Sequence, residues 1–350
     1  MGEFRIIQAD VLSGLASVAD GSVRCCVTSP PYWGLRDYGH EWQIGLEATP
    51  DAYVERMVGV FREVRRVLAD DGTLWLNLGD SYATGRGGTA MPAETLAGGV
   101  GGQGDDDAHR GRLAQVPNTK NPNAPIATYQ PHRNAGAIGL KHKDLVGIPW
   151  RVAFALQADG WYLRSDIIWA KPNPMPESVT DRPTKSHEYL FLLSKSARYY
   201  YDAAAIAEPI SADMAWRAER GYTRGGNGKV DASRCDAQTL RGEESKTIVP
   251  GTRNRRSVWT VATQPFRGAH FAVMPEALVE PCVLAGSAEG DTVLDPFTGS
   301  GTAGVVALRH NRNFVGTEIN PAYAKMASNR IYADQPLLNQ ESEGAEIAED

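Results

Sequence analysis

Two short segments of the chain carry residue types that could bind a small ligand at the end of a buried strand. In the first, "VLDPFTGSGT" at residues 293–302, Asp295 and two glycines separate an apolar run from the start of a helix. Open α/β sheets bind ligands at the carboxyl ends of their strands, and Gly299 and Gly301 permit a tight turn close to a ligand. The next strand pattern, "NFVGTEIN", ends in Glu318, where a carboxylate can bind ribose hydroxyls. These features predict a cofactor that carries a nucleoside.

The second segment, "TSPPYW" at residues 28–33, follows the apolar run "VRCCV". Two adjacent prolines cannot continue a central strand, because each lacks a backbone N–H and fixes its own φ. The chain therefore leaves the sheet in a stiff corner that presents backbone carbonyls and two aromatic rings, Tyr32 and Trp33. Packing into the core is the alternative interpretation for both rings.

Together, the two segments resemble the paired signature of S-adenosylmethionine-dependent DNA amino-methyltransferases. In that family the D-P-F-x-G-S-G-T loop surrounds the methionine part of the cofactor, and the [D/N/S]-P-P-[Y/F/W] corner holds the target base. Here the corner precedes the loop, which resembles the permuted β group, whose target-recognition region lies between the two motifs. Similar segments run from Phe4 to about Ile331.

The resemblance implies direct transfer of the methyl group of S-adenosyl-L-methionine to the exocyclic amine of a flipped base. The Ser29 hydroxyl and the backbone carbonyl around Pro30 would accept the N–H bonds of the amine, and Tyr32 would stack on the base. Catalysis would rest on positioning and preorganised hydrogen bonds instead of a covalent nucleophile. The implied catalytic residues are Ser29, Pro30, Pro31 and Tyr32.

The resemblance also implies which residues hold the cofactor. Asp10, in "QADVL", matches the acidic residue of the family that contacts the adenine amine, with a turn or helix cap as the alternative. The segment "HFAVMPEALVEPCVLAGS" resembles the helix that flanks the methionine carboxylate. The full set is Asp10, Phe271, Pro275, Asp295, Pro296, Phe297, Thr298, Gly299, Ser300, Gly301, Thr302 and Glu318.

Basic and aromatic residues outside the loop are expected to contact double-stranded DNA. Lys171, in "WAKPNPMPES", could reach the base pocket or the backbone, and "RNRRSVW" is the most concentrated basic segment. Arginine can pair with guanine edges or hold phosphates, and solvated loop charge is the alternative. The expected DNA-binding residues are Trp33, Lys171, Arg253, Arg255 and Arg256.

The target base stays open between cytosine N4 and adenine N6. Ser29 favours cytosine by the habit of the family, although members with serine that act on adenine are known. Cytosine-C5 chemistry is excluded, because Cys282 lies in an apolar helical pattern and not at a strand end.

Other functions remain as alternatives. They are methylation of RNA or of a protein glutamine, and DNA binding by a catalytically silent regulator. A nicotinamide dehydrogenase is disfavoured because the loop lacks G-x-G-x-x-G. A homodimer is a family expectation, and a cognate restriction enzyme stays open.

Composition and charge are those of a globular chain, with 42% hydrophobic and 22% charged residues. The net charge of −6 equals the charge of residues 334–350, an acidic tail that we expect to be disordered, so it does not argue against DNA. No apolar run approaches the roughly 20 residues that span a bilayer, and the N-terminus does not resemble a signal peptide. The four cysteines lack zinc-type spacing, which predicts no metal site and a reducing cytoplasmic setting.

Alternating strand and helix patterns predict an α/β fold, a Rossmann-like doubly wound methyltransferase sheet that is mostly parallel with an antiparallel hairpin. Helical spacing over residues 51–69 should end at "DDG", and residues 187–202 should form the hairpin. The methyltransferase domain is expected to comprise residues 1–83, 144–202 and 263–333. A Gly-rich insert at 84–143 and a basic target-recognition insert at 203–262 would interrupt it.

Overall fold

A mixed sheet forms the centre of the computed structural model, which describes residues 2–35, 40, 43–84, 135, 138–211, 251–264 and 273–335. Within these residues the sheet has eight strands, in the order β1-β10-β9-β2-β3-β5-β4-β8. Most of the two expected inserts, the tail beyond residue 335 and Phe271 lie outside the described residues.

One half of the sheet is parallel. Its neighbouring strands are β1 (Phe4–Gln8), β10 (Asn313–Glu318), β9 (Thr292–Asp295), β2 (Val23–Thr28) and β3 (Leu68–Leu78). The carboxyl ends of all these strands therefore meet at one edge of the sheet. Both sequence motifs begin at this edge, one after β2 and the other after β9.

The other half is mixed. β5 (His187–Ser194) pairs antiparallel with both β3 and β4 (Tyr162–Ala170), and β8 (Val258–Thr260) adds a parallel edge strand to β4. The hairpin expected over residues 187–202 is wrong, because this segment contributes one strand, which pairs with the preceding strand β4 and with β3 and not with the residues that follow it. As a result, the first residues of β5 lie at the same edge as the carboxyl ends of β3 and β4.

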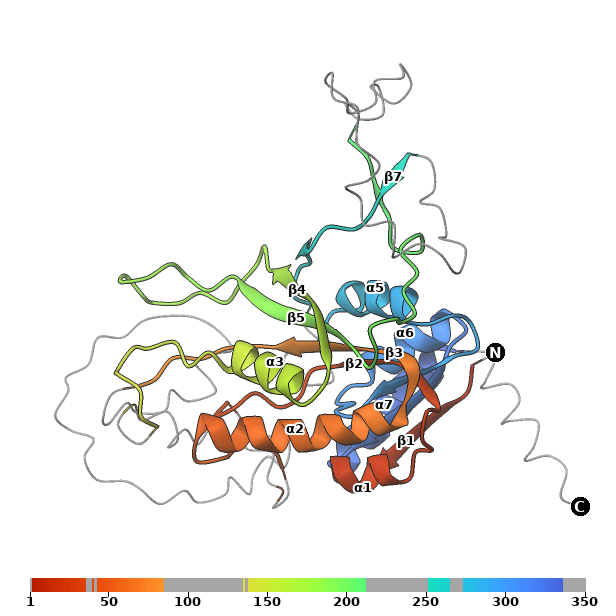
Figure 1. Cartoon of the computed structure of the whole chain (residues 1–350), viewed down its shortest axis with the longest axis horizontal. Coiled ribbons are helices and arrows are strands. Elements are labelled where there is room, and N and C mark those ends of the chain that lie inside the picture. The colour runs from red at the N-terminus through yellow and green to blue at the C-terminus, as the bar shows by residue number, and fades with distance from the viewer. Residues whose placement is uncertain are drawn as a thin grey trace, which may run out of the picture.

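Helices cover both faces of the sheet (Figure 1). The helices α1 (Val11–Ala16), α2 (Pro50–Val67) and α3 (Ile148–Ala158) pack on one face. The opposite face carries α5 (Glu276–Gly286), α6 (Thr302–Arg309) and α7 (Pro321–Asp334). Adjacent Cys25 and Cys26 belong to the two different cores, as alternation along a strand requires.

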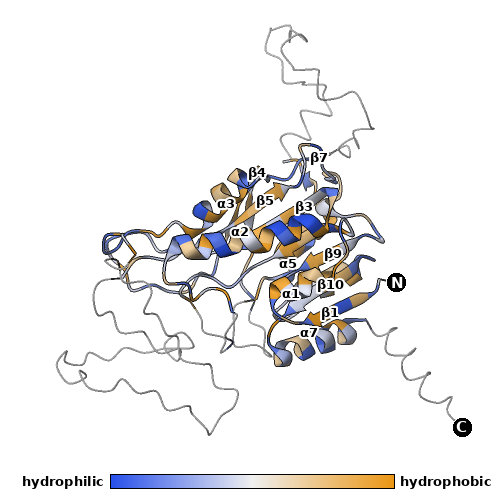
Figure 2. Ribbon diagram, turned by 60° about the horizontal axis from the view of Figure 1, so that its bottom comes forward, coloured by the Kyte–Doolittle hydropathy of each residue, from blue (hydrophilic) through white to orange (hydrophobic). Residues whose placement is uncertain are grey.

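The longest of these helices, α2, shows why the segments fold as they do. Thr49 caps its first turn by accepting a hydrogen bond from the Ala52 N–H, and the apolar positions recur at helical spacing. Figure 2 shows hydrophilic and hydrophobic residues alternating along α2 above a largely hydrophobic sheet. The helix passes directly into β3 at Leu68, which is fully buried opposite Val23, so "DDG" lies in the strand and does not end the helix.

Two segments differ from the expected domain boundaries. Residues 258–260, expected in the basic insert, form β8, and Trp259 is buried in the second core beside Trp75. Asp334, expected in the tail, ends α7 and forms an ion pair with Arg309. None of the helices in the described ranges is both long and apolar enough to cross a membrane.

Candidate active site

A cavity of about 270 Å³ lies at the carboxyl ends of the parallel strands and joins the two sequence motifs. From the corner after β2, it is lined by Ser29, Pro30, Pro31 and Tyr32. From the loop after β9, it is lined by Asp295, Pro296, Phe297, Thr298, Gly299, Ser300 and Thr302, with Glu318 at the end of β10. Ligand pockets in proteins are typically about 300–1,000 Å³, so this cavity is close to the lower limit.

Asp295 connects the two motifs. Thr28 at the end of β2 donates a hydrogen bond to Asp295 Oδ1 over 2.7 Å, and the Phe297 N–H donates to the same oxygen over 3.0 Å. The carboxyl is 3% exposed, and this burial raises its pKa from 3.8 to about 7. The side chain therefore holds the ends of β2 and β9 together while it faces the cavity.

The glycine loop depends on two left-handed residues. Gly299 and Gly301 have φ of 51° and 78°, and a Cβ on Gly301 would lie 2.9 Å from the Cβ of Ala327. The Gly299 N–H donates to Glu318 Oε2 over 2.8 Å, and the Asn320 N–H donates to Glu318 Oε1 over 2.9 Å. Burial raises the pKa of Glu318. Glu318 thus fixes the turn of the loop and also lines the cavity.

The corner after β2 is held from outside the cavity. The Tyr53 hydroxyl on α2 donates to the Pro31 carbonyl over 2.9 Å, and the Leu35 N–H donates to the Tyr32 carbonyl over 3.2 Å. No donor among the described residues reaches the carbonyl of Pro30, which lines the cavity. Ser29 Oγ donates a hydrogen bond to the Tyr32 hydroxyl over 3.4 Å, so its lone pairs, like this carbonyl, are left to accept from a ligand.

Tyr32 is fixed at its hydroxyl. The hydroxyl donates to Glu188 Oε2 over 2.7 Å and lies 3.1 Å from Asn77 Oδ1. Burial and the neighbouring Glu188 carboxylate raise the pKa of Tyr32 well above 10, so the phenol stays protonated. Gly79 leaves room for the ring, because a Cβ there would lie 2.5 Å from Tyr32 Cε2.

Lys171 completes this side of the cavity. Its Nζ lies 2.5 Å from Glu188 Oε1 and 4.1 Å from the centre of the Trp169 ring. The side chains of Lys171 and Glu188 are each 16% exposed, and both residues line the cavity together with Asn77 and Trp169. This side of the cavity thus contains a paired cation and carboxylate beside an aromatic ring.

Sequence reasoning missed Glu188 and Asn77. The available signal was a glutamate at the start of the apolar run "HEYLFLL", since a charged residue there must face either solvent or a site. That signal points to the cavity only after β5 is known to run antiparallel, with Glu188 opposite Trp169.

Trp33 and Asp10 differ from the expectation. Trp33 is 1% exposed in the core beneath α2, and its Nε1 donates to the Glu47 carbonyl over 2.8 Å, so the predicted DNA contact is wrong. Asp10 caps α1, because its Oδ1 accepts hydrogen bonds from the N–H groups of Leu12 and Ser13. Its neighbours line the cavity but Asp10 does not, so the cap alternative describes it.

The remaining predicted residues lie around the cavity or away from it. Pro275 is buried at the N-cap of α5, directly after the cavity-lining Met274, and Gly301 lies behind the loop. Arg253 and Arg256 form ion pairs with Glu208, and Arg255 lies 4.6 Å from the centre of the Trp259 ring. The three arginines therefore already contact groups of their own chain.

Comparison with known proteins identifies the family. Residues 23–329 match the DNA methylase family, defined by N6- and N4-type methyltransferases. The chain belongs to this DNA methylase family. It is 46% identical over 329 residues to the type II methyltransferase M.Cfr9I of Citrobacter freundii, covering 94% of this chain and 88% of the relative. It is also 46% identical over 326 residues to M.XycI of Xanthomonas campestris pv. cyanopsidis, covering 93% and 87%.

Solved structures share the fold. The PvuII DNA methyltransferase, described as cytosine-N4-specific, superposes with a TM-score of 0.56 at 16% identity, covering 94% of this chain and 86% of that one. A DNA modification methylase from Thermus thermophilus, solved with S-adenosyl-L-methionine, gives 0.52 at 21% identity and covers 96% and 97%. The expected methyltransferase sheet is confirmed.

The DNA methylase is therefore an enzyme that moves a methyl group from S-adenosyl-L-methionine to an exocyclic amine of a DNA base. The residues present fit this cofactor. The loop presents backbone beside a cavity, and two carboxyl groups, Asp295 and Glu318, face the same space. Carboxylates suit a ligand that carries a positive sulfur and ribose hydroxyls.

Proposed function

We propose that this DNA methylase acts on N4 of a cytosine that is flipped out of double-stranded DNA. The cavity that joins the "SPPY" corner to the glycine loop carries the proposal, because base and cofactor can meet there. Ser29 at the first corner position supports cytosine by the habit of the family. The description of the PvuII enzyme as cytosine-N4-specific supports the same base.

The corner positions the amine. An exocyclic amine is a poor nucleophile because its lone pair is delocalised into the ring. Hydrogen bonds from its two N–H groups to the Pro30 carbonyl and the Ser29 hydroxyl favour a tetrahedral nitrogen, whose lone pair is localised and can attack the methyl group. Both acceptors are held in place before the base arrives, which is the form of preorganisation that accelerates a transfer without a covalent intermediate.

Tyr32 of the corner and the residues beside it hold the base. Tyr32 stacks on the ring of the cytosine, and Glu188 keeps the Tyr32 side chain at one angle by accepting its hydroxyl proton in a hydrogen bond. Lys171 donates to an acceptor on the edge of the base. A base held by stacking on one side and by hydrogen bonds at its edge is the usual arrangement for a flipped nucleotide.

The glycine loop holds the cofactor. S-adenosyl-L-methionine supplies an activated methyl group on a positively charged sulfur when it is bound. Residues 296–300 contact its methionine part. The carboxylate oxygens of Glu318 accept hydrogen bonds from the ribose hydroxyls. The ionised form of Asp295 attracts the positive charge. Phe271, outside the described residues, and Pro275 belong to the segment proposed to flank the methionine carboxylate.

The relatives of this enzyme support a proposal about its partners. Because the similar proteins are type II methyltransferases, we propose methylation at a specific DNA sequence, with a restriction enzyme as the cognate partner. Target recognition belongs to the insert of residues 203–262, with Arg253, Arg255 and Arg256 as proposed phosphate or guanine contacts. A homodimer and a cytoplasmic location complete the proposal.

One assay separates the alternatives. The purified protein is incubated with labelled S-adenosyl-L-methionine and unmethylated genomic DNA, and the DNA is digested to nucleosides for mass spectrometry. We expect N4-methylcytosine. N6-methyladenine would overturn the choice of base but not the reaction, and absence of label in DNA would overturn both.

A further inference from the structure

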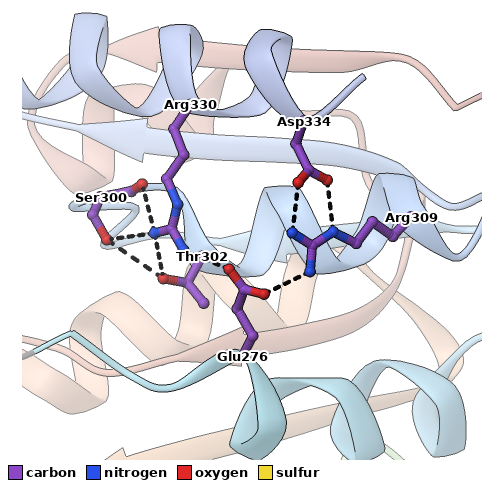
Figure 3. Close-up of polar contacts among 6 residues, drawn as sticks. All are labelled: Glu276, Ser300, Thr302, Arg309, Arg330 and Asp334. Atoms are coloured by element: carbon purple, nitrogen blue, oxygen red, sulfur yellow. Dashed lines mark hydrogen bonds and ion pairs between the residues drawn. The ribbon is translucent and has the colours of Figure 1, made fainter. Parts of the chain in front are cut away.

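The guanidinium of Arg330 binds the glycine loop directly. Its Nη1 lies 3.2 Å from the Ser300 carbonyl, 3.1 Å from Ser300 Oγ and 2.9 Å from Thr302 Oγ1 (Figure 3). The Arg330 side chain is on α7 and is 17% exposed, so these charge-assisted hydrogen bonds are partly shielded from water. The guanidinium thus binds both residues that flank Gly301.

The other terminal nitrogen of Arg330 binds a second element. Arg330 Nη2 lies 2.8 Å from Glu276 Oε1 at the start of α5. The second oxygen of Glu276 accepts from Arg309 Nη1 over 2.5 Å, and Arg309 pairs with Asp334 (Figure 3). The network therefore joins α5, α6 and α7, but only its Arg330 end touches the loop.

The two segments that Arg330 joins both reach the cavity. Ser300 and Thr302 line it directly, and Val273 and Met274 line it just before α5 begins at Glu276. Arg330 is not among the lining residues, so it acts through its neighbours. The Arg330 guanidinium therefore fixes the distance between the glycine loop and the segment that leads into α5, both of which line the cavity.

We propose that Arg330 is a positioning residue for cofactor binding. It holds the Ser300–Thr302 turn against the start of α5, so that the backbone of the loop has its binding conformation before the cofactor arrives. Such preorganisation strengthens binding by lowering the conformational cost of ordering the site. This inference rests on the proposed position of the cofactor at the glycine loop.

The test compares Arg330→Gln with Arg309→Gln by calorimetric titration of S-adenosyl-L-methionine. Both variants break ion pairs of one network, but only the first removes contacts to the loop. We expect Arg330→Gln to raise the Kd about tenfold, the factor that corresponds to about 1.4 kcal/mol. The KM for the cofactor should rise equally, while kcat and the KM for DNA stay unchanged.

Arg309→Gln should lower the unfolding temperature but leave the Kd within about twofold of wild type, the effect of a partly exposed ion pair. Arg330→Lys, which keeps one donor near the loop, should give an intermediate Kd. Equal changes of Kd in both glutamine variants, or no change in Arg330→Gln, would overturn the inference alone. Failure of the wild-type protein to bind the cofactor would overturn the proposed cofactor site and the inference with it.

Discussion

At the scale of single residues, Asp295 has the property that is easiest to test. Its pKa is raised by burial from 3.8 to about 7, so between these values the folded chain binds a proton that the unfolded chain has lost. The contribution of Asp295 to the free energy of unfolding therefore falls as pH rises from about 4 to 7. Asparagine keeps an acceptor for Thr28 and for the Phe297 N–H but carries no charge.

We therefore expect Asp295→Asn to be more stable than wild type at pH 8, by up to about 4 kcal/mol, since the pKa is raised from 3.8 to about 7 and each pKa unit corresponds to about 1.4 kcal/mol. At pH 4 the advantage should disappear. Urea unfolding of the cofactor-free protein at both pH values measures the difference. A stability difference that does not change with pH would contradict the burial argument.

Tyr32 and Glu188 should act as a unit. Tyr32→Phe keeps the ring that stacks on the base but removes the hydroxyl that Glu188 holds, and Glu188→Gln weakens the same contact from the other side. We expect each variant to lower the single-turnover rate about tenfold. Each should leave the Kd for S-adenosyl-L-methionine unchanged.

The double variant tests whether the two residues are coupled. Because both single changes act on the same contact, their effects should not multiply: adding Tyr32→Phe to Glu188→Gln should lower the rate by much less than tenfold, which is the signature of coupling in a double-mutant cycle. Rates that multiply in the double variant would show that Glu188 does not position Tyr32.

At the scale of elements, the end of β3 must leave space for the corner after β2. Gly79→Ala would place a Cβ 2.5 Å from the Tyr32 ring, so the ring must shift. We expect a fall in single-turnover rate of about tenfold or more, since small displacements of a reacting group are costly. Circular dichroism should show an intact fold.

Gly59→Ala on α2 is the matched control. Nothing lies within 4 Å of a Cβ at that position, so alanine should stabilise the helix by about 0.5–1 kcal/mol and leave activity unchanged. Equal activity of the two variants would contradict the role assigned to Gly79.

Local sequence signals predicted the elements that local chemistry controls. The turn from β9 into α6 follows from two glycines between an apolar run and a helix, and α2 follows from its periodic apolar face and capped start. Local signals did not predict features that depend on contacts between separate segments of the chain. The pairing of β5 with β3 and β4, the burial of Trp33 under α2 and the meeting of Glu188 with Tyr32 all depend on tertiary contacts.

At the scale of the whole molecule, strand direction explains why one cavity can serve two ligands. Five parallel strands bring the corner after β2 and the loop after β9 to one edge of the sheet, although the chain separates them by most of its length. The antiparallel β5 brings Glu188 to the same edge. Base and cofactor sites therefore follow from topology, and the motifs supply their chemistry.

A crystal structure with sinefungin, a cofactor analogue that carries an amine in place of the transferable methyl group, tests this claim most directly. We expect the analogue in the cavity, with its methionine part on residues 296–300. Its amine should point to the Ser29 hydroxyl and the Pro30 carbonyl, within about 3 Å of one of them. An analogue bound outside this cavity, or with its amine directed away from the corner, would show that base and cofactor do not meet there.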